Sequence, residues 1–371
     1  MSGQPAEWAE CEANMKKAKA ILAALCLLLI FFPFKCSALP ENIRPVSAQD
    51  HFSHRTEDRF YTENWRYHAI LDTGEFLSIS FILTNVGLIS GSAGVQLTLS
   101  GPHCNPVIMG DEFRLSYFEE NRQTGTISIG PHSMILKGNL TRLIFSKNGI
   151  KVDLTIRQRI EGFQIGDGVT VINGSRAEFK RTFLEIPRGD LEGVLTVRGA
   201  ARSVTGAIYM DHDASNVLPT SYSTNWYSLR AFFPDYTIAL QGFQYLPKAG
   251  NGRWAIGYVT DRNKVLGVST DFRIDKRGVH KSKGCSVPTD FEISMSAGDM
   301  KLNGTFTSEE LYCCAGVFDD FNWLVRKVGS SLIGNPIIFR FRSHADLFLT
   351  TPDRTLHLEG PAYSGIVSVG D

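Results

Sequence analysis

The stretch Leu140–Ile156, LTRLIFSKNGIKVDLTI, decides the fold class. Two runs rich in apolar and β-branched residues, Leu140–Phe145 and Ile150–Ile156, lie on either side of the pair Asn148-Gly149. Because Asn-Gly tolerates the positive φ angles of a two-residue reverse turn, the stretch predicts an antiparallel β-hairpin. The same style of sequence continues in both directions, which indicates an all-β protein.

Short runs of this kind recur about every ten residues from Trp65 onward, with turn residues between them. Phe76–Leu83 is apolar at nearly every second position, and Gly94–Leu99 alternates. The 371 residues suffice for about two domains, and 34 Gly, 24 Phe and 11 Tyr suit turn-rich, aromatic-lined sheets. The spacing predicts barrels or sandwiches, and counting strands divides the chain into residues 39–198 and 199–371.

One long helix is predicted near the C-terminus. Thr307-Ser308-Glu309-Glu310 has the form of a capping box, and apolar residues then recur at helical spacing from Leu311 to Val328. We expect this helix to cover one face or one mouth of a barrel.

Residues 1–38 have the features of a secretory signal peptide. Three lysines at positions 16, 17 and 19 precede the apolar run Ile21–Phe34, and small residues place cleavage after Ala38. A start at Met15 would give a compact signal of bacterial form. The run is about 14 residues, shorter than the roughly 20 that a spanning helix needs, which disfavours the alternative of an uncleaved anchor. We therefore expect an exported protein, periplasmic or secreted.

The charge balance disfavours nucleic acid as a partner. Lysine plus arginine and aspartate plus glutamate both number 38, so the formal net charge is zero. Nucleic-acid binding normally needs a basic excess.

Four cysteines follow the signal segment: Cys104, Cys285, Cys313 and Cys314. A bridge between the two adjacent cysteines is strained, so the prediction pairs Cys285 with Cys313 or Cys314 and leaves the connectivity open. A metal site built from three of these cysteines is the alternative. It is disfavoured because no CxxC or HxxxH spacing accompanies them, and we expect neither a metal nor a cofactor.

One polar and aromatic cluster stands out in a chain without the common hydrolase, phosphate-loop or dinucleotide motifs. Asp211 and His212 are the candidate catalytic pair, because an acid beside a histidine can hold its tautomer and raise its basicity. Aromatic and amide side chains around them would bind the ligand: Tyr209, Asp213, Asn225, Trp226 and Tyr227. The alternative is a turn at a barrel rim in which the aspartates cap backbone amides. A metal site here is disfavoured, because consecutive strand residues point to opposite faces.

The same residues resemble the tandem-lipocalin superfamily, which includes AttH-like proteins, carotenoid hydratases (hydroxyneurosporene synthase) and a fungal oxidative-stress survival factor. Gly206-Ala-Ile-Tyr-Met-Asp-His212 followed by Asn225-Trp226-Tyr227 is similar to the family's Asp-His segment and the strand after it. Phe179–Arg188 and Leu191–Thr196 add to the likeness, which spans about Trp65–Val369. The chain departs from the family after Asp213, where it runs Ala214-Ser215-Asn216, so no activity of one branch carries over.

The resemblance implies two lipocalin-like (calycin) antiparallel barrels in tandem, a shape that suits apolar ligands. One hypothesis is an exported lipid- or isoprenoid-binding protein with a carrier or sequestration role and transient membrane contact. The second is a hydratase or isomerase in which Asp211 protonates an alkene and Trp226 and Tyr227 stabilise the cation. Both hypotheses require these side chains to converge on one cavity. A structural scaffold is the third, favoured if side chains fill both barrels.

Overall fold

The hairpin predicted from Leu140–Ile156 is present in the computed structural model as β9 (Leu140–Lys147) and β10 (Ile150–Gln158). Its turn residues have positive φ angles, 45° at Asn148 and 78° at Gly149. Lys147 and Ile150 face each other across that turn, as a two-residue reverse turn requires. The structure describes residues 42–85, 91–102, 104–172, 175–249, 252–282, 284–317, 319, 327, 330 and 334–369.

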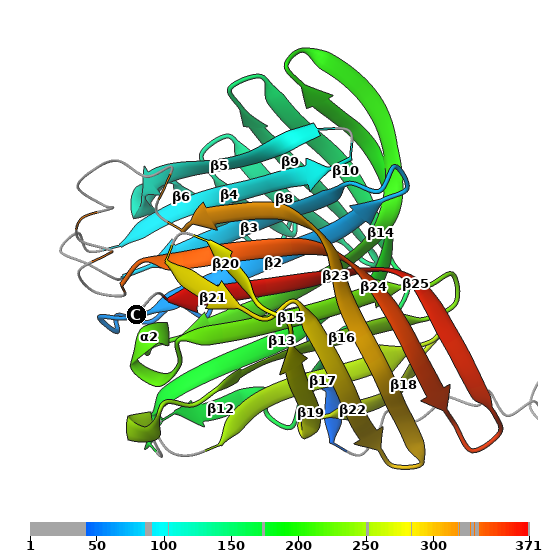
Figure 1. Ribbon diagram of the computed structural model, residues 1–371. Helices are drawn as coiled ribbons and strands as arrows, with labels where there is room; N and C mark the ends of the chain where they lie inside the picture. Colours follow the sequence, from blue (N-terminus) through cyan, green and yellow to red (C-terminus); the bar gives the residue numbers. More distant parts are fainter. Residues whose placement is uncertain are drawn as a thin grey trace, which may run out of the picture. The chain divides into compact units, whose positions relative to one another are not determined.

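The first sheet, here called the N-terminal barrel, is antiparallel and runs in the order β5-β4-β3-β2-β14-β13-β10-β9-β8-β7-β6 (Figure 1). Its other strands are β2 (Thr62–Leu71), β3 (Phe76–Thr84), β4 (Ser92–Gly101), β5 (Cys104–Arg114), β6 (Phe118–Asn121), β7 (Thr126–Ile129), β8 (His132–Lys137), β13 (Ser175–Val197) and β14 (Ala200–Ser215). Three short strands flank this path, β1 (Ile43–Pro45), β11 (Phe163–Ile165) and β12 (Val169–Ile172), and η1 (Leu115–Tyr117) joins β5 to β6. The interior is filled by large side chains, among them Trp65, Tyr67, Phe81 and Phe145.

The second sheet, the C-terminal barrel, is antiparallel too, in the order β18-β17-β16-β15-β25-β24-β23-β22-β19. Its strands are β15 (Asn225–Phe232), β16 (Thr237–Gln244), β17 (Arg253–Thr260), β18 (Val265–Ser269), β19 (Phe272–Arg277), β22 (Asp290–Ala297), β23 (Met300–Gly316), β24 (Pro336–Thr350) and β25 (Thr355–Val369). A separate ribbon pairs β20 (His280–Ser282) with β21 (Cys285–Val287), and the helical turns α2 (Pro219–Tyr222) and η2 (Pro247–Ala249) complete the order. Phe291, Phe306 and Phe339 are among its fully buried core residues.

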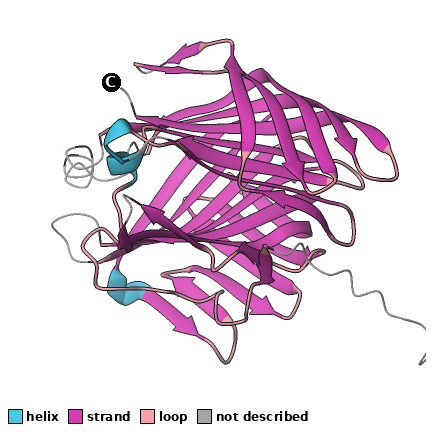
Figure 2. Cartoon of the chain, turned by 90° about the horizontal axis from the view of Figure 1, so that it is seen from below, coloured by secondary structure: helices cyan, strands magenta, loops and turns pink. Residues whose placement is uncertain are grey.

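The two barrels pack against each other through the outward-facing residues of their strands. Phe76 of β3 stacks on Tyr363 of β25 with ring centroids 4.0 Å apart. Tyr209 of β14 lies in one apolar cluster with Ile256 and Tyr258 of β17. Strands make up most of the described chain, as Figure 2 shows. The predicted all-β class with two antiparallel barrels is confirmed.

The predicted helix from Thr307 is wrong over its first ten residues. Strand β23 continues to Gly316 and pairs with β24 throughout. Register shifts fall between Ser308 and Glu310 and between Leu311 and Cys313, and such irregularities break the two-residue alternation. The apolar residues from Leu311 onward therefore have a spacing in sequence that resembles that of a helix. Most of the remaining predicted helix lies outside the described residues.

The predicted division at residue 198/199 does not match the sheets. It falls on the turn between β13 and β14, where Val197 pairs with Ala200. The N-terminal barrel continues to Ser215, and the C-terminal barrel begins at Asn225. Within the described residues no helix is long and apolar enough to cross a membrane.

Candidate functional site

Strand β14 carries the predicted cluster and divides it between its two faces. His212 pairs in register with Trp65 of β2, and both side chains point into the N-terminal barrel, where their rings stack at 4.5 Å. Asp211 pairs with Arg66 and faces the C-terminal barrel. Because side chains alternate along a strand, the predicted catalytic pair occupies two separate environments.

On the inner face, four side chains form what we call the imidazole chain: Glu63, His212, Glu185 and His51. The fully buried His212 lies between two carboxylates, with Nε2 2.8 Å from Glu63 Oε1 and Nδ1 2.9 Å from Glu185 Oε1. The other oxygen of Glu185, Oε2, lies 2.6 Å from His51 Nδ1. Acid and imidazole thus alternate along a continuous hydrogen-bonded path.

Opposite charges alternate along the imidazole chain. Burial alone would lower the pKa of His212, but Glu185 and Glu63 outweigh it and raise the pKa to about 10. Burial opposes ionisation of Glu185, yet His51 and His212 lower its pKa to about 2. Glu185 also raises the pKa of His51 against the effect of burial. At neutral pH the carboxylates of Glu63 and Glu185 therefore face the imidazolium of His212. Protonation of His51 adds a second imidazolium.

The imidazole chain ends at a cavity of about 520 Å³. We call it the mouth cavity. It is lined by the last two members of the imidazole chain, Glu185 and His51, and by apolar residues including Phe52, Tyr67 and Ile186. Polar side chains from Arg122 to Thr124 and the backbone around Gly138 complete its rim. A cavity of this size lies in the range of small-molecule sites and combines an apolar wall with a polar end.

The segment before β2 closes this end of the barrel. Phe52 packs into the barrel core, and the Trp65 indole donates a hydrogen bond to the His51 carbonyl at 3.0 Å. Glu63 accepts hydrogen bonds from Ser53 Oγ at 2.7 Å and from the His54 amide at 2.8 Å. The same carboxylate that holds His212 therefore fixes the segment over the cavity.

A second set of charged side chains lies on the outer face of β14. We call it the inter-barrel cluster, and its members are Arg66, Lys180, Asp211, Asp213, Arg230 and Arg340. Asp211 accepts hydrogen bonds from Arg66 Nε at 2.7 Å and from the Tyr209 hydroxyl at 2.6 Å. Asp213 accepts hydrogen bonds from Arg66, from Lys180 and, at 2.6 Å, from Thr182. Burial opposes ionisation of Asp213, but Arg66 and Lys180 hold its pKa below the usual range.

The aromatic residues of the prediction lie elsewhere. Trp226 packs in a small cluster with Tyr222 and Phe243, whereas Tyr227 points into the C-terminal barrel beside Phe291. Asn225 accepts a hydrogen bond from Ser368 Oγ at 2.8 Å and so holds β15 to β25. The expected convergence of Asp211, His212, Trp226 and Tyr227 on one cavity is wrong, because neighbours on a strand face opposite ways. The carrier and hydratase hypotheses therefore lose the site that the sequence predicted for them, and either one now needs a cavity lined by other residues. Ligand contact by any of these predicted residues stays a prediction.

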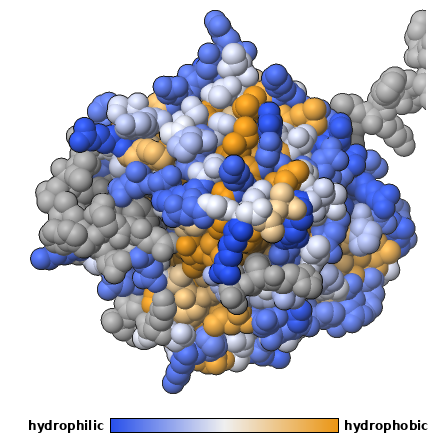
Figure 3. All heavy atoms as spheres, turned by 90° about the horizontal axis from the view of Figure 1, so that it is seen from above, coloured by the Kyte–Doolittle hydropathy of each residue, from blue (hydrophilic) through white to orange (hydrophobic). Residues whose placement is uncertain are grey.

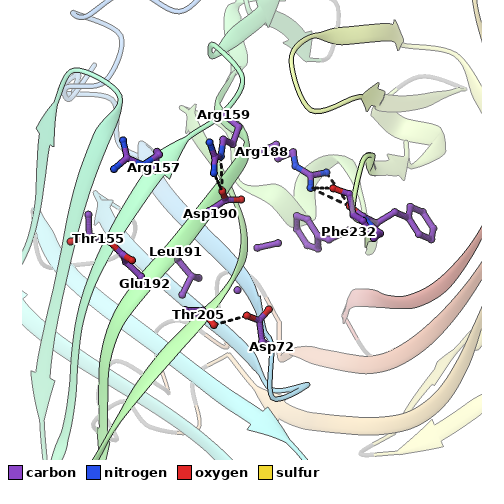
Figure 4. A pocket seen from close by; sticks show the side chains of 14 residues that line it. Asp72, Thr155, Arg157, Arg159, Arg188, Asp190, Leu191, Glu192, Thr205 and Phe232 are labelled. Carbon is purple, nitrogen blue, oxygen red and sulfur yellow. Dashed lines mark hydrogen bonds and ion pairs between the residues drawn. The ribbon is translucent and has the colours of Figure 1, made fainter.

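A groove of about 580 Å³ lies where β10, β13 and β14 meet residues Phe232–Pro234 (Figure 4). Arg188 is anchored there by hydrogen bonds to the Phe233 and Pro234 carbonyls and to Thr237 Oγ1. Arg159 is paired with Asp190 at the groove's edge. The anchored guanidinium of Arg188 joins the two barrels, which indicates a structural role for this end of the groove.

The predicted disulfide is absent. Cys285, Cys313 and Cys314 form no disulfide with one another. Cys285 Sγ faces the Ser368 carbonyl at 3.9 Å, and Cys314 Sγ faces Ser282 Oγ at 3.4 Å. The sulfurs of Cys285 and Cys314 are thus directed to different neighbours. The side chain of Cys104 lies outside the described residues.

Sequence reasoning missed Glu63, Glu185 and His51. Glu63 and Glu185 are separated from His212 by 149 and 27 residues, so only the strand pairing brings them together. A charged residue at an inward-facing position of β2, between Tyr61 and Trp65, was the available signal. Among the described residues no group of three or more His, Cys, Asp or Glu side chains is arranged to hold a metal ion.

The sequence of this chain is similar to part of one curated protein, and its fold is similar to several solved structures. No family model matches the chain. The ceramide-binding protein svf1 of Schizosaccharomyces pombe is 26% identical over 129 residues, covering 33% of this chain and 33% of that protein. The match therefore spans about a third of the curated relative's length.

Solved structures match over most of the chain. A putative AttH from Nitrosomonas europaea aligns with a TM-score of 0.62 at 11% identity, covering 89% of this chain and 98% of that one. CghA with Sch210972 gives 0.61 at 11% identity, with 84% and 89% covered. Kievitone hydratase from Nectria haematococca gives 0.55 at 12% identity, with 89% and 98% covered. The chain therefore has the tandem lipocalin-like fold that its resemblance to the AttH-like, hydratase and survival-factor superfamily implies.

Proposed function

We propose that this protein binds an amphiphilic lipid or isoprenoid in the mouth cavity and acts as a carrier or sequestering protein. One observation carries the proposal: an ion pair between His51 and Glu185 lies at one end of a 520 Å³ cavity with Phe52, Tyr67 and Ile186 in its wall. An amphiphile needs both a polar anchor for its head and apolar wall for its chain. The proposal puts such a ligand at the mouth of the N-terminal barrel because large side chains fill the barrel interior.

The curated relative supports the ligand class. That protein is described as ceramide-binding, and it shares 26% identity over 129 residues with this chain. Ceramide carries hydroxyl and amide groups that can exchange hydrogen bonds with a carboxylate and an imidazole. We infer a neutral or zwitterionic head group, because the charges of the imidazole chain already compensate one another.

Lipid extraction and mass spectrometry of the purified protein test the proposal first, followed by titration with a fluorescent short-chain ceramide. Ala48→Trp adds bulk at the exposed rim of the cavity, and Ala201→Trp at an exposed strand start is the control. We expect Ala48→Trp to lose the copurifying lipid and to weaken probe binding at least about tenfold, which corresponds to 1.4 kcal/mol. A lipid-free extract with no probe binding, or full binding by Ala48→Trp, would overturn the proposal.

A hydratase or isomerase is the second candidate function. The observation that favours it is His51, which lines the cavity and has a raised pKa, so that it can carry a proton to a bound alkene. Asp211 does not suit the role of that acid, because it is fully buried and accepts hydrogen bonds from Arg66 and Tyr209. Turnover of an isoprenoid alkene that disappears in His51→Asn, with ceramide binding retained, would identify the enzyme.

We also propose that residues 15–38 direct export and are removed after Ala38. The lysine-rich start, the short apolar run and the small residues at the cleavage position support this proposal. A reporter fused to residues 15–38 should be exported, and the mature protein should begin Leu39-Pro40. A purified protein that retains the apolar run would contradict it.

A further inference from the structure

The inter-barrel cluster contains more positive than negative charge. Arg66 and Lys180 share the two carboxylates, Asp211 and Asp213, in direct ion pairs. Arg230 Nη2 reaches no closer than 3.6 Å to Asp211 Oδ2, which already accepts the Tyr209 hydroxyl. Arg340 has no carboxylate partner among the described residues, and its Nη1 donates only to the Phe339 carbonyl, at 3.4 Å. Four cations thus face two carboxylates.

Part of this excess is buried, since Arg230 and Lys180 are buried whereas Arg66 and Arg340 are partly exposed. Arg230 is 2% exposed, and its guanidinium lies 4.1 Å from the centre of the Tyr209 ring. Arg340 lies 5.9 Å from the centre of the Tyr363 ring, and Gly365 leaves room for its Nη1. Burial, together with Arg230, Arg340 and Arg66, keeps the pKa of His68 well below its usual value, so His68 is neutral. An uncompensated guanidinium in such surroundings is costly.

Three buried polar atoms beside these guanidinium groups also lack hydrogen-bond partners. They are Arg230 Nε, His68 Nδ1 and the Tyr363 hydroxyl. Arg230 and Tyr363 are direct register partners on β15 and β25. His68 is linked to them by ring contacts, at 6.3 Å to Tyr209 and 5.9 Å to Phe76, which stacks on Tyr363. Buried polar atoms in native proteins almost always have a partner, and the residues that the structure describes do not supply one for these three atoms.

We propose that the inter-barrel cluster binds a phosphate group, held by the guanidinium groups of Arg230 and Arg340 and by the Tyr363 hydroxyl. A phosphate brings up to two negative charges and several acceptor oxygens, which matches the charge excess and the unpaired donors together. The same group could be a free phosphate ion or the head of a phosphorylated amphiphile. This site is separate from the mouth cavity, which lies on the other face of β14.

Thermal unfolding at constant ionic strength tests the site, with inorganic phosphate raised from zero to about 10 mM. We expect the wild-type Tm to rise by roughly 2–4 °C for each tenfold increase above Kd. Arg230→Gln and Arg340→Gln should abolish this rise. Arg142→Gln, which removes an exposed partner of Asp153, is the matched control and should keep it.

A second arm distinguishes the two sources of phosphate. Decyl phosphate that raises Tm at a lower concentration than inorganic phosphate would identify an amphiphile as the ligand, and equal effects would identify the free ion. Decanol controls for the alkyl chain.

Phosphate released on denaturing the extensively dialysed wild-type protein gives a readout that needs no variant. About one phosphate per chain would support the site. The proposal is overturned if the dialysed wild-type protein releases no phosphate and neither phosphate nor decyl phosphate raises its Tm more than that of Arg230→Gln or Arg340→Gln. Ceramide binding in the mouth cavity should survive both substitutions, so failure of one site is distinguishable from failure of the other.

Discussion

The two faces of β14 hold two buried charge clusters built from neighbouring residues, and the clusters differ in how their charges are compensated. In the imidazole chain, His212 is enclosed by Glu63 and Glu185, and His51 completes the path. In the inter-barrel cluster, Arg66, Lys180, Arg230 and Arg340 face only Asp211 and Asp213. The first cluster is complete within the chain, which suits a structural support beneath a cavity. The second cluster is incomplete, which suits a site that takes up an anion.

Removal of a cation from the complete cluster should have the largest effect. His212→Leu leaves Glu63 and Glu185 buried without the imidazolium between them, and breaking a buried pair in this way costs about 3–5 kcal/mol. Urea unfolding measures the loss, with His344→Ala on the exposed side of β24 as the control. Glu63→Gln and Glu185→Gln in the same chain should recover part of it. A loss as small as that of the control would show that His212 is not the counter-charge of these carboxylates.

Alkaline pH should weaken the imidazole chain without any substitution. The folded pKa of His212, about 10, lies above its usual value of 6.5. A group whose folded pKa is raised contributes stability that is complete below pH 6.5 and is lost as pH rises to about 10. The slope from this group is at most about 1.4 kcal/mol per pH unit.

The measurement is the difference in unfolding free energy between wild type and His212→Leu at pH 6, 8 and 10. Taking the difference removes the titration of buried tyrosines, since both proteins share it. We expect the difference to shrink as pH rises. A difference that stays constant would show that His212 has no raised pKa.

Local rules predicted the parts of this fold that depend on neighbouring residues. The Asn148-Gly149 hairpin was predicted because a two-residue turn has its own chemistry. The capping box at Thr307 was misleading, because the pairing of β23 with β24 satisfies the same backbone groups and bulges disturb the alternation. Propensity yields to a long cross-strand ladder in such cases.

The candidate site was predicted only in part, for a related reason. The Asp211-His212 segment was identified, and strand alternation already implied that its side chains diverge. Their partners come from β2, β13 and the segment around His51, and no local pattern connects these. The imidazole chain can be recognised only when the register of β2, β13 and β14 is known.

The Tyr209 hydroxyl donates a hydrogen bond to Asp211 Oδ2, the same oxygen that lies 3.6 Å from Arg230 Nη2. Tyr209→Phe therefore tests how a carboxylate of the incomplete cluster is stabilised. The change removes a hydrogen bond of 2.6 Å to a carboxylate, for which we expect a loss of about 1.5–3 kcal/mol. Arg230 can then approach Asp211, so we expect the loss of unfolding free energy to lie near the lower end of this range. Tyr117→Phe at an exposed position is the control. A loss equal to that of the control would mean that the hydroxyl does not support Asp211.

The smallest effect should come from removing a cation where cations are in excess. Arg340→Met keeps most of the side-chain volume and removes a guanidinium whose hydrogen bond to the Phe339 carbonyl is long, at 3.4 Å. Burial lowers the pKa of Arg340 to about 10, in the direction expected of a cation that its surroundings do not compensate. In phosphate-free buffer we therefore expect an unfolding free energy that is unchanged or higher by up to about 1 kcal/mol. His212→Leu under the same conditions is the comparison. The two substitutions should differ by several kcal/mol, although each removes one cation from a charge cluster of this chain. If Arg340→Met is as damaging as His212→Leu, the inter-barrel cluster already has its counter-charge within the chain, and the contrast between the two faces of β14 is lost.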